Sequence, residues 1–213
     1  PVLGVGGILV PGPAFFRRLS DLRREVPFDL ICDEVQSGFG RCGGDLFAFR
    51  RFGLEPDVVC LAKGIANGFP MGMISSTEEI SASLSEKLHF STFGGNPVSC
   101  AAALATLEII KRENLTGNAE RVGEHLMRRL DEGLKHIPQC VEIRGLGLMI
   151  GVELTGVETA MNVVQECYEQ GLLIGLGGRH RNVLRIEPPL TFTTDMADRT
   201  AAIIQAALLK QRP

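Results

Sequence analysis

The sequence has 213 residues, a hydrophobic content of 45% and a formal net charge of -3. This length is enough for one large domain or for a domain and a half. The slightly acidic balance provides no basic surface for nucleic acid. The apolar runs are too short to span a bilayer, and the first residues lack the charged and apolar regions of a secretory signal peptide. We therefore expect neither a nucleic-acid partner nor a membrane partner.

The six cysteines are scattered along the chain, with no Cys-x-x-Cys pair and no spacing typical of metal ligands. Four of them lie in apolar segments, where a free cysteine behaves as a small hydrophobic residue. This usage predicts buried thiols, no metal site and a reducing intracellular compartment, either cytoplasmic or mitochondrial.

The first half of the chain predicts helices that alternate with buried strands. A helical stripe over 14–26 is followed by an apolar run over 28–32, a second over 58–62 and a third over 71–75. Strands roughly thirty residues apart, with helix and loop between them, fit βαβ units and a parallel sheet in an α/β fold. The Gly-rich stretch over 37–44 predicts a loop.

A domain boundary is predicted after the next helix. Asn96 and Pro97 favour a helix start, because Asn is a good N-cap and Pro is favoured at the first helical position. The polar stretch over 111–117 then separates a domain of residues 1–112 from a small α/β or α+β domain of residues 113–213.

The expected small domain begins with a long helix that has Val122, Leu126, Leu130 and Leu134 on one face and ends before Pro138. Short strands and helices then alternate. The strands are expected over 140–144, 148–154, 172–174 and 183–186, and the helices over 157–170, with Gly171 at its C′ position, and over 194–210, capped by Thr194.

Asp33 and Lys63 are each the charged residue at the end of a short apolar run. The carboxyl ends of parallel strands form the ligand-binding edge of such a sheet. An amine that forms a Schiff base and an acid that keeps a pyridinium nitrogen protonated suit a pyridoxal phosphate (PLP) site. A buried strand end would desolvate the lysine, and Gly64 and Gly68 would leave room for a cofactor. A lysine that reaches into water and an aspartate that caps a turn fit the same positions.

Two neighbouring segments carry further binding candidates. The residues Glu34, Val35 and Gln36 present several groups near one point, so that Val35 could pack flat on a ring and Gln36 could donate to a phenolic oxygen. The Gly-rich turn over 91–97 leads into a helix N-terminus, where backbone N–H groups and a hydroxyl could hold a phosphate. An ordinary capped loop explains that turn equally.

Arg185 lies inside an apolar strand, where it is costly to bury unless it meets an anion. A substrate carboxylate would match its two-pronged geometry. An internal ion pair with Glu153 or Glu187 is the alternative. The run Arg144–Gly151 is superficially similar to a dinucleotide-binding fingerprint, but its third glycine comes one residue too late and no acidic residue follows at the required distance. We predict a tight turn between strands there.

Five motifs follow one another along the sequence. They are Asp33-Glu34-Val35-Gln36 with Gly38-Phe39-Gly40-Arg41, Ala62-Lys63-Gly64 with Gly68-Phe69-Pro70-Met71-Gly72, Ser91-Thr92-Phe93-Gly94-Gly95-Asn96-Pro97, Arg144-Gly145-Leu146-Gly147-Leu148-Met149, and Arg185-Ile186-Glu187-Pro188-Pro189. This series resembles the class III (subgroup II) aminotransferases, which are PLP enzymes of fold type I. The stretch 64–72 is most similar to the alanine–glyoxylate aminotransferase 2-like branch, which also includes phospho-lyases.

The resemblance implies a role for each candidate in PLP binding. Lys63 is expected to be the Schiff-base and catalytic lysine, and Asp33 is expected to pair with the pyridine nitrogen. Val35 packs on the ring, and Gln36 reaches the phenolic oxygen. Thr92 binds the cofactor phosphate of the neighbouring subunit, which implies a homodimer with a shared active site.

By the same resemblance, Arg185 binds the α-carboxylate of the substrate, and the reaction is a ping-pong transfer of an amino group between an amino acid or amine and a 2-oxo acid. Elimination by a phospho-lyase or decarboxylation on the same scaffold remains an alternative. Residues 1–112 correspond to the C-terminal part of the PLP-binding large domain with its mixed sheet, and residues 113–213 to the small domain.

The chain departs from the family at its beginning. It starts abruptly at Pro1 without Met, Leu3 stands where family members often have Gln, and the family's own phosphate-binding turn and ring-stacking aromatic residue lie upstream of the matched region. The chain therefore matches roughly the C-terminal half of the family. We expect a fragment or processed chain with an exposed sheet edge, and a non-catalytic truncated subunit is a further alternative.

Overall fold

The computed structural model describes residues 1–85, 87 and 90–211 and has the predicted mixed α/β architecture. The chain divides into two compact units. Unit 1 comprises Pro1, Pro11–Gly40 and Asp45–Leu115, and unit 2 comprises Val2–Val10, Arg41–Gly44 and Thr116–Pro213.

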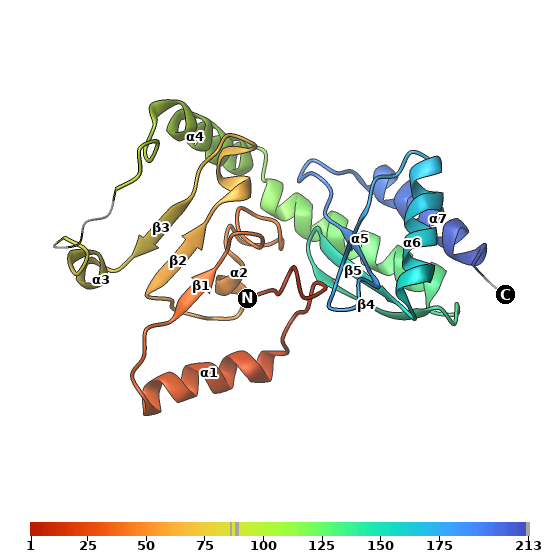
Figure 1. Ribbon diagram of the computed structural model, residues 1–213, viewed down its shortest axis with the longest axis horizontal. Helices are drawn as coiled ribbons and strands as arrows, with labels where there is room; N and C mark the ends of the chain where they lie inside the picture. Colours follow the sequence, from red (N-terminus) through yellow and green to blue (C-terminus); the bar gives the residue numbers. More distant parts are fainter. Residues whose placement is uncertain (86, 88–89, 212–213) are drawn as a thin grey trace. The chain divides into compact units, whose positions relative to one another are not determined.

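Unit 1 is built around a three-stranded sheet in the order β1-β2-β3, which Figure 1 shows with its helices. Its elements are α1 (Pro13–Glu25), β1 (Ile31–Asp33), α2 (Ala48–Arg51), β2 (Val58–Leu61), the 3-10 helix η1 (Lys63–Ala66), β3 (Met73–Ser76), α3 (Glu78–Ala82) and α4 (Pro97–Arg112). Strands β1 and β2 are parallel, as predicted, but β3 runs antiparallel to β2. The sheet is therefore mixed, as the family resemblance implied, because η1 leads the chain straight back to β2, without the helical crossover that a parallel neighbour needs.

Helix α4 of unit 1 has the predicted N-cap, and α1 is held by aromatic packing. The side-chain oxygen of Asn96 accepts a hydrogen bond from the Ser99 backbone N–H at 2.9 Å, which confirms the predicted start of α4. The Ser99 hydroxyl donates to the Pro70 carbonyl at 3.0 Å and ties α4 to the segment before β3. Phe16 of α1 stacks on Phe52, with ring centroids 3.9 Å apart, in a small core that secures α1 to unit 1.

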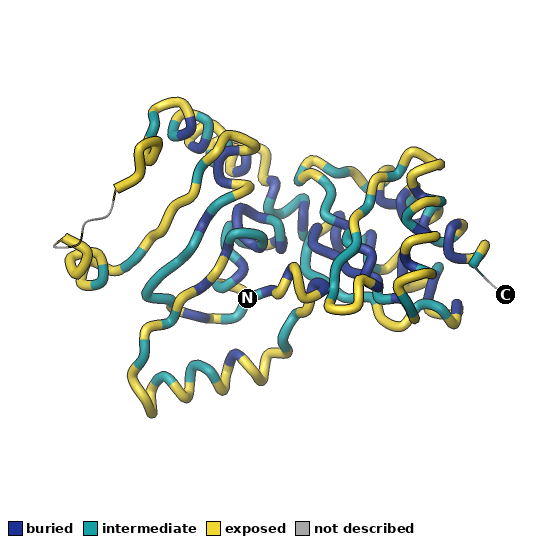
Figure 2. The backbone as a smooth tube through the Cα atoms, in the orientation of Figure 1, coloured by how far each residue is buried: buried dark blue, intermediate teal, exposed yellow. Residues whose placement is uncertain are grey.

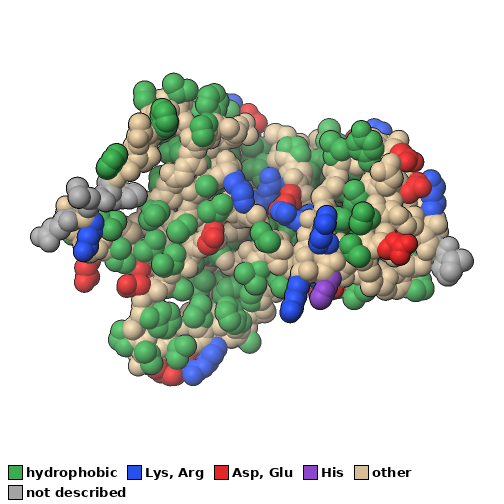
Figure 3. Space-filling model, in the orientation of Figure 1, with side chains coloured by type: hydrophobic (Ala, Val, Ile, Leu, Met, Phe, Trp, Pro, Cys, Tyr) green, Lys and Arg blue, Asp and Glu red, His purple; other side chains and the backbone are tan. Residues whose placement is uncertain are grey.

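Much of the apolar surface of unit 1 is open to solvent. Ile31 of β1 is 60% exposed, and Ile74 of β3 is 69% exposed. Figure 2 shows β3 and much of α4 as exposed, and Figure 3 shows apolar side chains at the surface of this region. Among the described residues, no helix has the length and apolar character needed to cross a membrane.

Unit 2 is built around an antiparallel sheet in the order β4-β5-β7-β6. Its elements are α5 (Leu115–Leu134), β4 (Cys140–Leu146), β5 (Met149–Leu154), α6 (Val157–Glu169), β6 (Gly175–Gly177), β7 (Val183–Ile186) and α7 (Thr194–Leu209). Leu146 pairs with Met149 across the β4–β5 turn, which confirms the tight turn predicted for the Gly-rich run.

Two local predictions for unit 2 are wrong by a few residues. The strand expected over 172–174 lies at β6 instead, because Leu172 and Ile174 pack against the core and the following Gly-Leu-Gly segment pairs with β7. Helix α7 is capped by Thr193 rather than Thr194, since the Thr193 hydroxyl accepts from the Met196 backbone N–H at 3.2 Å.

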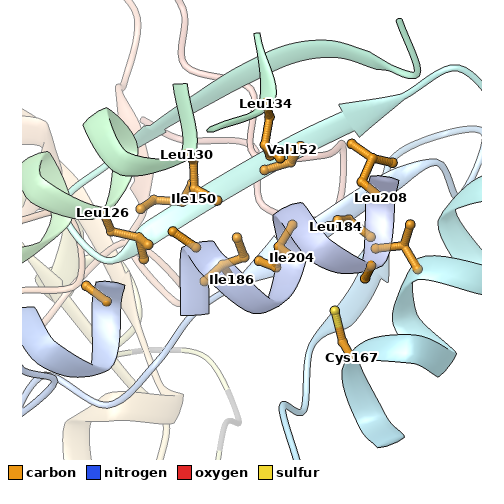
Figure 4. Packing of buried hydrophobic residues seen from close by; sticks show 14 of the residues in the cluster. Leu126, Leu130, Leu134, Ile150, Val152, Cys167, Leu184, Ile186, Ile204 and Leu208 are labelled. Carbon is orange, nitrogen blue, oxygen red and sulfur yellow. The ribbon is translucent and has the colours of Figure 1, made fainter. Parts of the chain in front are cut away.

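A single apolar core joins the helices of unit 2 to its sheet, as Figure 4 shows. It includes the predicted stripe of α5, whose members are fully buried, together with side chains of β5, β7, α6 and α7. The labelled members are Leu126, Leu130, Leu134, Ile150, Val152, Cys167, Leu184, Ile186, Ile204 and Leu208. The size of this core indicates that packing, more than helix propensity, stabilises α5.

Two segments from the first part of the sequence belong to unit 2 through specific hydrogen bonds. Arg144 donates from Nε to the Gly7 carbonyl at 3.0 Å. The backbone of Arg41 accepts from the Leu148 N–H at 3.0 Å, and its Nη1 donates to the Leu148 carbonyl at 3.1 Å. The division into 1–112 and 113–213 would place both segments in the first domain, so it differs from the compact units here. The functional identity of the two ranges stays a prediction.

Candidate active site

Asp33 and Lys63 follow two adjacent parallel strands. Asp33 is the last residue of β1 and lies opposite Cys60 of β2, and Lys63 begins η1 just after β2 ends. The Glu34 N–H donates to the Cys60 carbonyl at 2.9 Å and continues the pairing beyond Asp33. Because the strands are parallel, both residues come to the carboxyl edge of the sheet, where ligands bind in folds of this kind.

The carboxylate of Asp33 is tied to the turn that follows β1. Asp33 is exposed, and its Oδ1 accepts a hydrogen bond from the Val35 backbone N–H at 2.9 Å. Gln36 in this turn is half-buried, and its Oε1 is buried without a hydrogen-bond partner in the described part of the chain. A half-turn of the amide exchanges its oxygen and nitrogen, so this position can accept or donate. The Gln36 amide thus has an unmet hydrogen bond that a ligand can satisfy.

Lys63 adopts a backbone conformation that is unusual for a residue with a side chain. Its φ is 47°, in the left-handed region, which costs about 1–2 kcal/mol for a residue other than glycine. The conformation is held by η1, in which Ile65 and Ala66 are buried and the Ile65 N–H donates to the Ala62 carbonyl at 3.1 Å. Such strain is typical of functional sites. The predicted desolvation of Lys63 is wrong, because the residue stands outside β2 and is exposed.

The two strand-end turns also contact each other. Phe39, which is buried in the turn after β1, lies against Gly64 of η1: a Cβ on Gly64 would be 3.6 Å from the Phe39 Cβ. Asp33, Val35 and Gln36 therefore belong to a turn that packs on the segment carrying Lys63.

Thr92 is exposed in the turn that precedes Asn96 and α4. No hydrogen bond links Thr92 to Asp33, Val35, Gln36 or Lys63 among the residues that the structure describes. Its predicted action on a neighbouring subunit remains a prediction.

Arg185 lies in unit 2, on β7, and has an acidic partner. Its Nη2 is 2.5 Å from Oε2 of Glu187, while its Nε is buried without a hydrogen-bond partner in the described chain. Both of its neighbours across the sheet, Gly151 and Gly175, are glycines. A Cβ on Gly177 would lie 2.4 Å from the Arg185 Cδ. The internal ion pair is therefore present, and one guanidinium donor is still unmet.

The other acid considered for Arg185 has a different partner. Oε2 of Glu153 lies 2.6 Å from Nη1 of Arg144. This hydrogen bond is the main reason that the pKa of the Glu153 carboxyl lies below its ordinary value. Glu153 of β5 thus forms its ion pair with Arg144 of β4.

No disulfide joins the described cysteines, and three of them are buried. Burial raises the pKa of the Cys167 thiol to about 11, and it raises the pKa of Cys32 and of Cys140 as well. These shifts disfavour the reactive thiolate at neutral pH. Within the described residues, no group of three or more His, Cys, Asp and Glu side chains could hold a metal ion.

Sequence reasoning missed the position of Glu34. It predicted that Glu34 would add to the polar groups presented around Asp33, but the side chain is fully buried. The signal available was weak, because a charged residue beside a strand end is usually exposed. The Glu34 side chain therefore lies in the interior of unit 1 and is not exposed at the carboxyl edge of its sheet.

Comparison with known proteins identifies the family. The profile of the class-III aminotransferases matches residues 1–208. The mitochondrial alanine–glyoxylate aminotransferase 2 homolog 2 of Arabidopsis thaliana is 41% identical over 206 residues, which cover 92% of this chain and 43% of that protein. The chain spans about half the length of the curated relatives it matches.

Solved structures agree in fold over the whole chain. A phospholyase from Arthrobacter, in complex with phosphoethanolamine, is 30% identical with a TM-score of 0.93 and covers 100% of this chain and 52% of its own. The ornithine aminotransferase of Toxoplasma gondii, a structure with partial occupancy of PLP at its active site, is 33% identical with a TM-score of 0.91 and covers 99% of this chain and 49% of its own. The chain belongs to the class-III aminotransferase family.

Proposed function

We propose that this chain carries the reactive lysine of a PLP-dependent aminotransferase, which moves an amino group between an amino acid or amine and a 2-oxo acid by a ping-pong mechanism. The observation that carries the proposal is the placement of Asp33 and Lys63 at the carboxyl ends of two adjacent parallel strands. Membership of the class-III family supports it, as does the PLP reported in the Toxoplasma gondii relative.

The residues of unit 1 fit the cofactor. The Asp33 carboxylate can hold the ring nitrogen protonated, and the unmet hydrogen bond of Gln36 suits the phenolic oxygen. The half-buried side chain of Val35 supplies an apolar surface for the ring. When bound, PLP supplies an electron sink for bonds broken at the substrate Cα.

The amine of Lys63 has a second task in the proposed reaction. With PLP bound, the Lys63 amine would move the proton at the substrate Cα as general acid and base, a role worth roughly 10²–10⁴-fold in rate. The exposed position of Lys63 and its fixed backbone allow the amine to reach a ligand at the strand ends.

Arg185 orients the substrate in this proposal by binding its α-carboxylate. The guanidinium has an unmet Nε donor, but its Nη2 already contacts Glu187. A substrate carboxylate must therefore compete with, or displace, the Glu187 carboxylate. This competition predicts that Glu187 lowers the affinity for amino acids.

We extend the proposal to a homodimer in which Thr92 binds the phosphate of the partner's cofactor. The exposed position of Thr92 in the turn before α4 supports such an exchange. The intracellular compartment also remains a proposal, supported by the mitochondrial designation of the plant relative.

One alternative reaction has an observation in its favour. The similarity to the Arthrobacter phospholyase favours elimination of phosphate from a phosphorylated amine, and assays for oxo acid against phosphate release distinguish the two reactions.

The test is borohydride reduction of the purified protein with PLP, followed by mass spectrometry of the intact chain and its peptides. A pyridoxyl group covalently bound to Lys63 is the expected result. A protein of the full family length that gains no such group would refute the proposal. A 213-residue protein that gains none would show only that this part of the chain does not hold the cofactor by itself.

A further inference from the structure

Glu34 is a fully buried carboxylate directly beside Asp33. Its Oε2 accepts from the Ser37 hydroxyl at 2.7 Å, and its Oε1 accepts from the Phe49 backbone N–H at 2.7 Å. No Lys or Arg of the described chain forms an ion pair with it. Burying a carboxylate is expensive unless hydrogen bonds satisfy it. Its two short hydrogen bonds identify Glu34 as a fixed structural centre of this region.

The backbone of Glu34 is fixed as firmly as its side chain. Its N–H donates to Cys60 of β2 at 2.9 Å, and its carbonyl accepts from the Gly38 N–H at 3.0 Å. Gly38 has no room for a side chain, because a Cβ there would lie 2.7 Å from that carbonyl oxygen. One residue thus connects β1, β2, the turn after β1 and the start of α2.

This arrangement encloses the proposed ring-binding residues. Val35 and Gln36 lie between Glu34 and the two residues bonded to it, Ser37 and Gly38. The Val35 N–H in turn holds Oδ1 of Asp33 at 2.9 Å. Any displacement of the Glu34 side chain therefore shifts the apolar surface, the amide and the carboxylate together.

We infer that Glu34 is a positioning residue for the PLP site, which holds the turn carrying Val35 and Gln36 and thereby aims Asp33. The inference rests on the function proposed above. Glu34 contacts neither substrate nor cofactor in this role. It acts through the hydrogen bonds to Ser37 and Phe49.

The chemistry of the two donors allows a sharp test. In Glu34→Gln the amide oxygen can still accept from Phe49, and the amide N–H can donate to Ser37, whose hydroxyl rotates to accept. In Glu34→Ala both contacts are lost, and the partly buried Phe49 N–H is left without its partner. The matched control is Ile110→Ala, which removes a buried side chain from α4, outside the turn.

The assays are titration of the full-length protein with PLP, followed by the cofactor's visible absorbance, and the pH dependence of that absorbance. We expect Glu34→Ala to weaken PLP binding by at least about tenfold and to shift the pH profile, since each lost buried partner is worth about a tenfold change. Glu34→Gln should stay within about threefold of the parent, on the same scale. Ile110→Ala should lose thermal stability without moving the pH profile.

Several outcomes would overturn the inference. One is a Glu34→Ala protein that binds PLP as Ile110→Ala does, and another is a Glu34→Gln protein as impaired as Glu34→Ala. If Glu34→Ala fails to fold, Ser37→Ala, which removes one hydrogen bond, must show the shifted profile. Failure of the parent to bind PLP or to form the Lys63 adduct would instead refute the proposed function.

Discussion

Replacing Gly123 of α5 by alanine should destabilise unit 2, because the helix backbone approaches the β4–β5 turn at that residue. A Cβ on Gly123 would lie 2.0 Å from the carbonyl oxygen of Gly147 and 2.3 Å from its carbonyl carbon. Gly147 has little freedom to retreat. Its φ is 54°, and a Cβ there would lie 2.4 Å from the backbone carbon of Cys42. The helix and the turn are thus in direct backbone contact.

Helix propensity alone would favour alanine over glycine by about 1 kcal/mol. Overpacking costs about 1–3 kcal/mol, and here it acts against backbone on both sides. Because both sides of the contact are backbone, we take the upper end of that range, about 3 kcal/mol, and subtract the propensity gain. We therefore expect Gly123→Ala to lower the free energy of unfolding by about 2 kcal/mol. The control is Gly133→Ala in the same helix, whose Cβ would meet the flexible end of Gln205 at 3.2 Å.

The control should be neutral or up to about 1 kcal/mol more stable, because the Gln205 side chain can move aside. The two variants should therefore differ by about 2–3 kcal/mol in urea unfolding followed by circular dichroism. Equal unfolding midpoints would refute the close approach of α5 to the turn. They would also reopen the alternative that the glycines of the turn serve a dinucleotide and not the packing.

Three further predictions concern individual side chains. Lys63→Ala should abolish turnover in the full-length enzyme. Lys63→Gly should be more stable than Lys63→Ala by about 1 kcal/mol in thermal unfolding, because only glycine adopts the positive φ of position 63 without strain. Equal stabilities of the two variants would contradict this strain. Arg185→Lys should raise the KM for amino acids, since a point charge cannot replace a two-pronged contact; an unchanged KM would leave Arg185 only its ion pair. The pKa of Glu153 is lowered by Arg144, so the pair's stabilisation is full above about pH 4.3, the ordinary value for Glu, and is lost as pH falls through the lower folded value. Urea unfolding against pH should therefore show a flatter acid limb for Glu153→Gln, and an unaltered limb would exclude this ion pair as its source.

Elements that depend on neighbours in sequence were predictable, whereas those that depend on distant partners were not. Asn96 followed by Pro97 marks the start of α4, because capping is a local interaction. The direction of β3 depends on how the chain returns to β2, which no local pattern reports. Strand β6 is a Gly-Leu-Gly segment with poor strand propensity, and it is a strand because β7 lies beside it.

The candidate site shows the same division. Asp33 and Lys63 were identifiable because each ends an apolar run, and the strand ends place them at one edge. The burial of Glu34 was not identifiable, since its partner Phe49 lies fifteen residues away and donates from the backbone. Spacing left two acids open for Arg185, and only the structure shows that Glu187 is the one it contacts.

Gly177 and Arg185 constrain the side chains at each other's positions. Because a Cβ on Gly177 would overlap the Arg185 Cδ, no side chain can arise at position 177 while the arginine stem keeps its path. A relative that carries a larger residue at the position of Gly177 should therefore have a shorter residue in place of Arg185. The two positions are therefore expected to covary among members of the family, so that the length of the side chain at position 185 is constrained from the neighbouring strand β6.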